Sequence, residues 1–134
     1  MKVKMIFLFF FQLVFLFTMV SEFVFLLFIT IACNPFTGQC GQTPVFIAAW
    51  CGHVGALEFL LNHGASPLTC DVNGWSPLLA AAFDGHAPAV ALLLARGADR
   101  SVATTSMFDG IAAGSTPLSV ARKKGHSKIV ALLR

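Results

Sequence analysis

The stretch that decides the fold is residues 74–86, which read GWSPLLAAAFDGH. It contains a hydroxyl residue followed by proline and, nine residues later, a glycine followed by histidine. Both landmarks occur three times, as Thr43-Pro44 with Gly52-His53, Ser76-Pro77 with Gly85-His86, and Thr116-Pro117 with Gly125-His126. The first two copies are 33 residues apart and the third follows after 40, so seven residues are inserted before it. A spacing in this range indicates a protein built from stacked repeats.

Each copy has the signals of two short helices joined by a tight turn. The hydroxyl residue is a preferred N-cap, the proline suits the first helical position, and the glycine ends the first helix. Small residues such as Ala48-Ala49 and Ala80-Ala81-Ala82 let neighbouring helices approach closely. An apolar stripe then marks a second helix in each copy, at Leu57, Leu60 and Leu61, at Val90, Leu93 and Leu94, and at Ile129, Val130 and Leu133. The pattern predicts an all-α solenoid of helix pairs, with a tight turn at Asn73-Gly74.

These landmarks resemble the ankyrin repeat over residues 41–134, about two thirds of the chain. The copies fall at residues 41–73, at 74–113 with the insertion, and at 114–134, where the third is incomplete. The family's Thr-Pro-Leu-His box lacks its histidine, because that place is held by Phe46, Leu79 and Ser119. The resemblance implies that hydrogen bonds made by this histidine between repeats are missing, so that the repeats are looser than average.

The number of repeats predicts marginal stability. About three repeats are needed to bury a common core, and end repeats should carry a polar outer face. Copy three stops at Leu133-Arg134 without its closing Gly-Ala turn. We therefore favour a fragment of a longer repeat array. The alternative is that the basic residues of copy three make it polar enough to serve as a cap; these are Arg122, Lys123, Lys124 and Lys128.

The N-terminal segment, residues 1–32, differs in composition from the rest of the chain. Apolar residues make up 25 of its 32 positions, and the run over residues 5–32 is long enough to form a membrane-crossing helix with tilt. Glu22, near the middle of that run, opposes insertion by about 2.5–3.5 kcal/mol. Three interpretations stay open: an uncleaved membrane anchor, a signal peptide, and non-native translation of a pyrimidine-rich stretch. Residues 33–40 are expected to form a linker.

The charges beside this segment bear on where the repeats lie. Lys2 and Lys4 precede it, and the next basic residue is Arg96. The positive-inside rule therefore places the N-terminus in the cytosol and the repeats across the membrane, although repeats of this kind are expected to be mostly intracellular. We expect the protein to be membrane-associated if residues 5–32 form a genuine span, and cytoplasmic otherwise.

The composition gives no sign of catalysis, a cofactor or a metal site. The four cysteines lie at Cys33, Cys40, Cys51 and Cys70, without a C-x-x-C pair. The histidines at the Gly-His landmarks are interpreted as structural, and the scattered acidic residues, such as Asp71 and Asp99, as turn and capping groups. A net charge of +3, with 11% charged residues, excludes intrinsic disorder and a highly basic nucleic-acid binder. No small-molecule substrate is expected.

What remains is a binding surface. In a helix-pair solenoid the first helices and the hairpin tips line a concave face. The residue pairs before the three Gly-His landmarks are Trp50-Cys51, Phe83-Asp84 and Lys123-Lys124, which predict a groove with two exposed aromatic residues at one end and a basic pair at the other. The hairpin tips add Asn73, Trp75, Arg100, Met107 and Phe108, of which Trp75 is open to a purely packing role. Aromatic residues are enriched as interface anchors.

The functional prediction is therefore a non-catalytic scaffold that binds another protein through this face. Two alternatives stay open: a membrane-tethered repeat protein, with possible membrane contact through residues 5–32, and a regulatory fragment of a larger multidomain protein.

Overall fold

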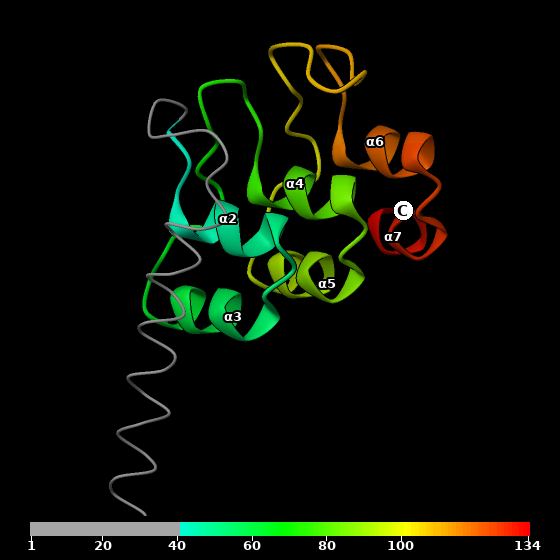
Figure 1. Ribbon diagram of the computed structural model, residues 1–134. Helices are drawn as coiled ribbons and strands as arrows, with labels where there is room; N and C mark the ends of the chain where they lie inside the picture. Colours follow the sequence, from blue (N-terminus) through cyan, green and yellow to red (C-terminus); the bar gives the residue numbers. More distant parts are fainter. Residues whose placement is uncertain (1–40) are drawn as a thin grey trace, which may run out of the picture.

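The structure is a computed structural model that describes residues 41–134. Within this range the chain forms three pairs of antiparallel helices arranged in two layers (Figure 1). The inner layer consists of α2 (Pro44–Trp50), α4 (Pro77–Asp84) and α6 (Pro117–Lys124). The outer layer consists of α3 (Val54–Asn62), α5 (Ala87–Ala95) and α7 (Ser127–Leu133). The all-α solenoid is confirmed for residues 41–134, whereas the apolar helix expected over residues 1–32 lies outside them.

The inner helices begin and end where the sequence predicts. Thr43, Ser76 and Thr116 have extended backbones, and each side chain accepts a hydrogen bond from the N–H three residues on. Each is followed by proline at the start of the helix. Gly85 and Gly125 then adopt the left-handed conformation that stops α4 and α6. Local chemistry thus fixes the ends of the inner helices.

The core runs along the stack because each helix packs on the equivalent helix of the next repeat. Helix α4 lies between α2 and α6, and α5 lies between α3 and α7. Every residue of α4 from Pro77 to Phe83 is buried, including Ala80, Ala81 and Ala82, which have no exposed surface. Alanine side chains allow this close approach on both sides at once. In the outer layer, the predicted stripe is buried at Leu57, Val90, Leu93, Ile129 and Leu133.

Two long connections project from the inner layer, and we call them fingers (Figure 1). The first finger, residues 65–76, joins α3 to α4, and the second finger, residues 98–116, joins α5 to α6. The first finger has a tight turn one residue earlier than the predicted Asn73-Gly74 pair, since the Gly74 N–H donates to the Asp71 carbonyl at 3.1 Å and Val72 and Asn73 are its central residues. The Asp71 carboxylate supports it by accepting from the backbone N–H groups of Asn73 and Trp75. The seven-residue insertion lies in the second finger.

None of the helices within residues 41–134 has the length and apolar character that crossing a membrane requires. The predicted span over residues 5–32 lies outside the described residues.

Candidate protein-binding surface

An aromatic cluster lies where the ends of α2 and α4 meet the two fingers. Trp50 ends α2, Phe83 lies in the last turn of α4, and Trp75 and Phe108 come from the first and second fingers. The Trp50 ring stacks on Trp75 at 5.8 Å between centroids and lies 6.0 Å from Phe83. Phe108 stands edge-on to Trp75 at 5.3 Å and to Trp50 at 6.1 Å. These are favourable separations and angles for aromatic pairs.

Trp75 is the centre of this cluster. Its side chain is 2% exposed, and the rings of Phe83 and Phe108 stand at steep angles to it, 70° and 81°. Its indole Nε1 is buried and has no hydrogen-bond partner among residues 41–134. Trp75 therefore holds the cluster together by packing.

The insertion folds into a small hairpin of its own. Phe108 and Ile111 exchange both backbone hydrogen bonds, at 3.1 and 2.8 Å. Between them Asp109 and Gly110 have φ values of +45° and +75°, the two left-handed residues of a type I′ turn. This conformation directs Phe108 toward the aromatic cluster and leaves Ile111 buried, with 1% of its surface exposed.

Thr104 closes the base of this hairpin. It is 3% exposed, and its hydroxyl donates to the Ala112 carbonyl at 2.9 Å while accepting from the Ser115 N–H at 3.2 Å. The backbone of Thr104 also pairs with Ser115 and Gly114. The long loop is thereby reduced to a short ordered unit, which we call the inserted hairpin, residues 105–114.

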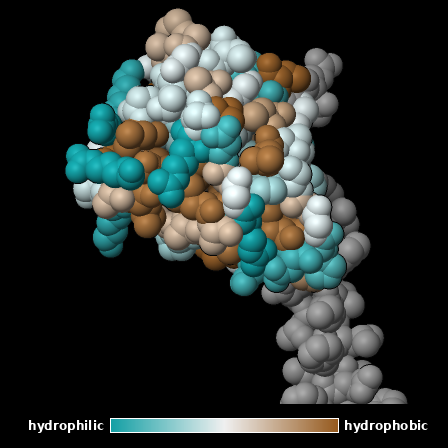
Figure 2. All heavy atoms as spheres, turned by 180° about the vertical axis from the view of Figure 1, so that it is seen from behind, coloured by the Kyte–Doolittle hydropathy of each residue, from teal (hydrophilic) through white to brown (hydrophobic). Residues whose placement is uncertain are grey.

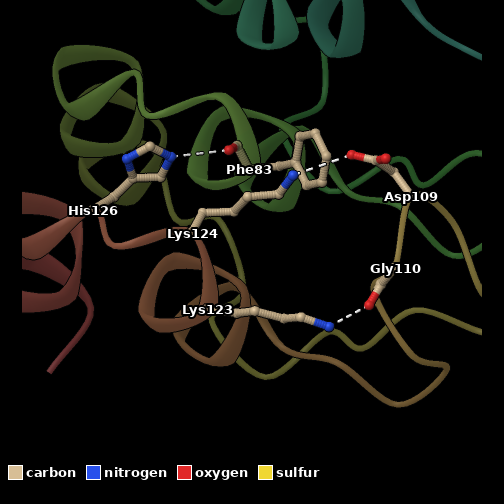
Figure 3. Close-up of polar contacts among 6 residues, drawn as sticks. All are labelled: Phe83, Asp109, Gly110, Lys123, Lys124 and His126. Atoms are coloured by element: carbon tan, nitrogen blue, oxygen red, sulfur yellow. Dashed lines mark hydrogen bonds and ion pairs between the residues drawn. The ribbon is translucent and has the colours of Figure 1, made fainter.

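Two lysines at the end of α6 contact the inserted hairpin (Figure 3). The Lys124 Nζ lies 3.1 Å from a carboxylate oxygen of Asp109 and 3.9 Å from the centroid of the Phe83 ring. The neighbouring Lys123 Nζ donates to the Gly110 carbonyl. Because these groups are exposed, an ion pair of this kind contributes about 0–1 kcal/mol and a cation–π contact about 0.5–1 kcal/mol.

The inserted hairpin contacts four residues of α2, α4 and α6, which we call the inner surface: Trp50, Phe83, Lys123 and Lys124. Three of them occupy equivalent places in successive repeats, since Trp50, Phe83 and Lys123 each stand two residues before a Gly-His landmark. The inner surface thus draws one equivalent position from each of the three repeats. On the face shown in Figure 2, hydrophilic and hydrophobic side chains lie interleaved.

The Gly-His landmarks join adjacent repeats. The His126 Nε2 donates to the Phe83 carbonyl at 3.0 Å, which links the start of α7 to the end of α4 (Figure 3). A Cβ added at Gly85 would lie 2.7 Å from the His126 ring, and one at Gly52 would lie 2.4 Å from the His86 ring. The structural role predicted for these histidines is confirmed for His126. Glycine is required by close approach as well as by its positive φ.

One prediction about exposure is wrong. Phe83 was expected to be an exposed aromatic residue, but it is 8% exposed because Phe108 and the Lys124 side chain cover it. Trp75 takes the packing role that the sequence left open. Trp50, Cys51 and Asn73 are half-buried, and the remaining predicted contact residues are exposed: Asp84, Arg100, Met107, Phe108, Lys123 and Lys124. Whether any of them contacts a partner stays a prediction.

The predicted turn roles of two acidic residues are also confirmed. Asp99 accepts hydrogen bonds from the backbone N–H and the hydroxyl of Ser101, at 2.8 and 2.6 Å, and these bonds hold the pKa of Asp99 below its usual value.

Partial burial raises the pKa of the Cys70 thiol, with a further contribution from the negative charges of Asp71 and Asp99. Within residues 41–134, no group of His, Cys, Asp or Glu side chains is placed to hold a metal ion.

The Asp109-Gly110 pair is a signal that the sequence analysis missed. Asp-Gly flanked by apolar residues is the usual mark of a two-residue hairpin, and here Phe108 and Ile111 flank it. The pair predicts that residues near it form a hairpin. It does not predict which helix the hairpin contacts, because the residues of α6 that it meets are distant in the sequence.

A family comparison agrees with this architecture. The family model described as ankyrin repeats, in three copies, matches residues 16–104 and 70–134. The chain therefore belongs to the ankyrin-repeat family. Ankyrin repeats are generally scaffolds for protein–protein interaction, and the family is typically non-catalytic. The matched range begins inside the segment 1–32 that was predicted as a leader. A comparison with curated proteins found no match.

Proposed function

We propose that this protein is a non-catalytic scaffold that binds another protein through its inner surface and the exposed parts of the fingers. The observation that carries the proposal is that equivalent positions of the three repeats supply Trp50, Phe83 and Lys123. Trp50 is half-buried and Lys123 is exposed, whereas Phe83 lies beneath Phe108 and Lys124. A partner that follows the stack would thus meet the exposed part of the aromatic cluster and then the lysine pair.

The exposure of the second finger supports the same proposal. Met107 is 75% exposed and Phe108 is 38% exposed, at the tip of an ordered hairpin. Asp84, at the end of α4, and Arg100, in the second finger, are also exposed. Met107 is therefore a favourable anchor, because a large apolar side chain on rigid backbone loses little conformational entropy when it binds.

The test is site-specific photo-crosslinking in extract of the cells that make the protein. Benzoylphenylalanine replaces Asp84, which is exposed at the end of α4, or Ala91, which is exposed on the outer helix α5. We expect a discrete covalent adduct from the Asp84 position and none from the Ala91 position. Equal labelling from both positions, or adducts from Ala91 alone, would remove the inner surface from the proposal.

A membrane-tethered form of the same scaffold rests on the apolar sequence of residues 5–32. It predicts that the full chain sediments with membranes and resists extraction by alkaline carbonate. Its repeats would resist protease in sealed vesicles if the positive-inside rule sets the topology. Recovery of the full chain in the supernatant after ultracentrifugation would contradict the tether and leave the protein-binding proposal intact.

A further inference from the structure

The inserted hairpin already makes the contacts that a bound peptide would make on the inner surface. Three consecutive residues take part, and Figure 3 shows the second and third of them, Asp109 and Gly110. Phe108 packs against Trp50, Trp75 and Phe83, Asp109 pairs with Lys124, and the Gly110 carbonyl accepts from Lys123. The Phe108 ring therefore meets the aromatic cluster. The Asp109 carboxylate meets the ammonium group of Lys124, and the Gly110 carbonyl meets that of Lys123.

These contacts are partly exposed to solvent. Phe108 retains 38% of its surface exposed, and the side chains of Asp109 and Lys124 are 61% and 31% exposed. By contrast, the backbone of the hairpin is held by buried groups: Thr104 at its base, and Ile111, which pairs with Phe108 through both backbone hydrogen bonds. The side chains of Phe108 and Asp109 can consequently rotate away from the inner surface while the backbone of the hairpin stays in place.

We infer that the inserted hairpin occupies the partner-binding part of the inner surface in cis, and that the partner segment which displaces it carries an aromatic side chain followed directly by a carboxylate. This inference rests on the proposed function and adds the chemistry of the partner and a competition step. The lysine pair selects for negative charge, and the aromatic cluster selects for a flat ring. A partner with the opposite charge would meet two unpaired lysines and be disfavoured.

Competition has a quantitative consequence. When the binding-competent state is only a fraction of the population, the apparent affinity falls by that fraction. A variant whose hairpin tip cannot occupy the surface should therefore bind the same segment more tightly. Phe108→Ala with Asp109→Asn is suited to this purpose, because asparagine removes the charge and tolerates the left-handed conformation of residue 109.

The probe is a fluorescein-labelled cyclic peptide with the sequence of residues 104–115, TTSMFDGIAAGS. It is titrated by fluorescence anisotropy into the full chain, into the Phe108→Ala/Asp109→Asn variant, and into the control Leu132→Ala, which changes a similarly exposed apolar residue on the outer helix α7. We expect the double variant to bind at least about tenfold more tightly than the wild-type chain, and Leu132→Ala to resemble wild type. Adding Lys124→Ala to the double variant should weaken binding of the peptide about fivefold, since the carboxylate of the aspartate in the peptide loses its partner.

A second readout comes from the two tryptophans of the chain, Trp50 and Trp75, which both lie in the cluster. The peptide contains no tryptophan, so a change in protein emission on binding locates it at the inner surface. Equal affinity for wild type and the double variant, or unchanged tryptophan emission at saturation, would overturn the inference. So would absence of binding to a double variant with a wild-type circular dichroism spectrum. Should the double variant fail to fold, Asp109→Asn alone gives the same comparison with an expected difference of about threefold.

Failure of this inference is distinguishable from failure of the proposed function. If the peptide does not bind but benzoylphenylalanine at position 84 still captures a protein, only the competition and the partner chemistry are wrong. If the peptide binds as expected but no adduct forms at position 84, the inner surface accepts the segment and the proposed role in binding a separate protein is wrong.

Discussion

Each of the two fingers joins an outer helix to the next inner helix, but different contacts hold the two fingers in place. The first finger turns within four residues and is held by the carboxylate of its own Asp71. The second finger carries seven more residues and forms a separate hairpin, which is fixed at its base by Thr104 and contacts α6 through its tip. The first is a local structure, and the second depends on residues of the next repeat.

The difference shows how a repeat protein can accommodate an insertion. A longer surface loop costs little additional closure entropy, so stability alone does not require the extra residues to be ordered. Here they are ordered, and they bury Ile111 and cover Phe83. The first finger also supports the second, since Asn73 accepts hydrogen bonds from the Thr105 N–H and the Ser106 hydroxyl.

Removing the buried apolar anchor of the second finger should have the largest effect. We expect Ile111→Ala to lower the free energy of unfolding by about 2–4 kcal/mol, because the residue is 1% exposed and leaves a cavity. Its counterpart in the first finger, Val72→Ala, should change stability by less than about 0.5 kcal/mol, since Val72 is 66% exposed. Urea denaturation of both variants measures the difference. Equal losses would mean that the fingers contribute alike.

The next test compares a glycine in each finger with the same backbone conformation. Gly74 and Gly110 have φ values of +74° and +75°. A Cβ at Gly74 would lie 3.0 Å from Thr105, whereas no other atom of residues 41–134 would lie within 4 Å of one at Gly110. We expect Gly110→Ala to cost about 1 kcal/mol from strain alone and Gly74→Ala about 2 kcal/mol or more. Similar unfolding midpoints for the two variants would show that the contact between the fingers relaxes freely.

Thr104→Val tests the base of the inserted hairpin. Valine has nearly the same shape but leaves the Ala112 carbonyl and the Ser115 N–H without the hydroxyl. The expected loss is about 1–2 kcal/mol, with faster hydrogen exchange over residues 105–114. Thr69→Val, at an exposed position of the first finger, is the control and should be near neutral. Unchanged exchange rates in the second finger would contradict a role for Thr104 in closing it.

The smallest expected effect concerns the electrostatic link between the fingers. The pKa of Cys70 is raised by partial burial and by the charges of Asp71 and Asp99, so less thiolate is present near pH 8 and alkylation should be slow. Asp99→Asn removes one negative charge, so the pKa should fall slightly and the rate of iodoacetamide labelling at Cys70 should rise. Peptide mass spectrometry over a pH series measures this. A rate that does not respond to Asp99→Asn would assign the raised pKa to burial and Asp71.

The sequence predicted the repeats well because their signals are local. The N-caps Thr43, Ser76 and Thr116 and the stop at Gly85 act within one turn of their own helices, so periodicity was enough to place them. The resemblance also explained the Gly-His pairs, although the approach of each histidine to the preceding repeat became visible only in three dimensions.

The part that could not be predicted lies outside the period. The burial of Phe83 depends on Phe108 and Lys124, which belong to the insertion and to the next repeat. No spacing rule relates these three residues. The histidine missing from the Thr-Pro-Leu-His box is replaced by buried Phe46 and Leu79 and by Ser119, whose hydroxyl accepts from the Thr116 N–H in a capping box. Whether this makes the repeats looser stays a prediction.

The interlock between glycine and histidine gives the stack a direction. His86 lies against Gly52 and His126 lies against Gly85, whereas no atom of the described part of the chain lies within 4 Å of the position that a Cβ would take at Gly125. An engineered extension after Arg134 therefore has a defined docking position, provided that it preserves the register and brings its own histidine to Gly125. Exchanging single helices between repeats would separate a histidine from the glycine that it packs against. The smallest segment that can be exchanged therefore contains a histidine together with the glycine of the repeat before it.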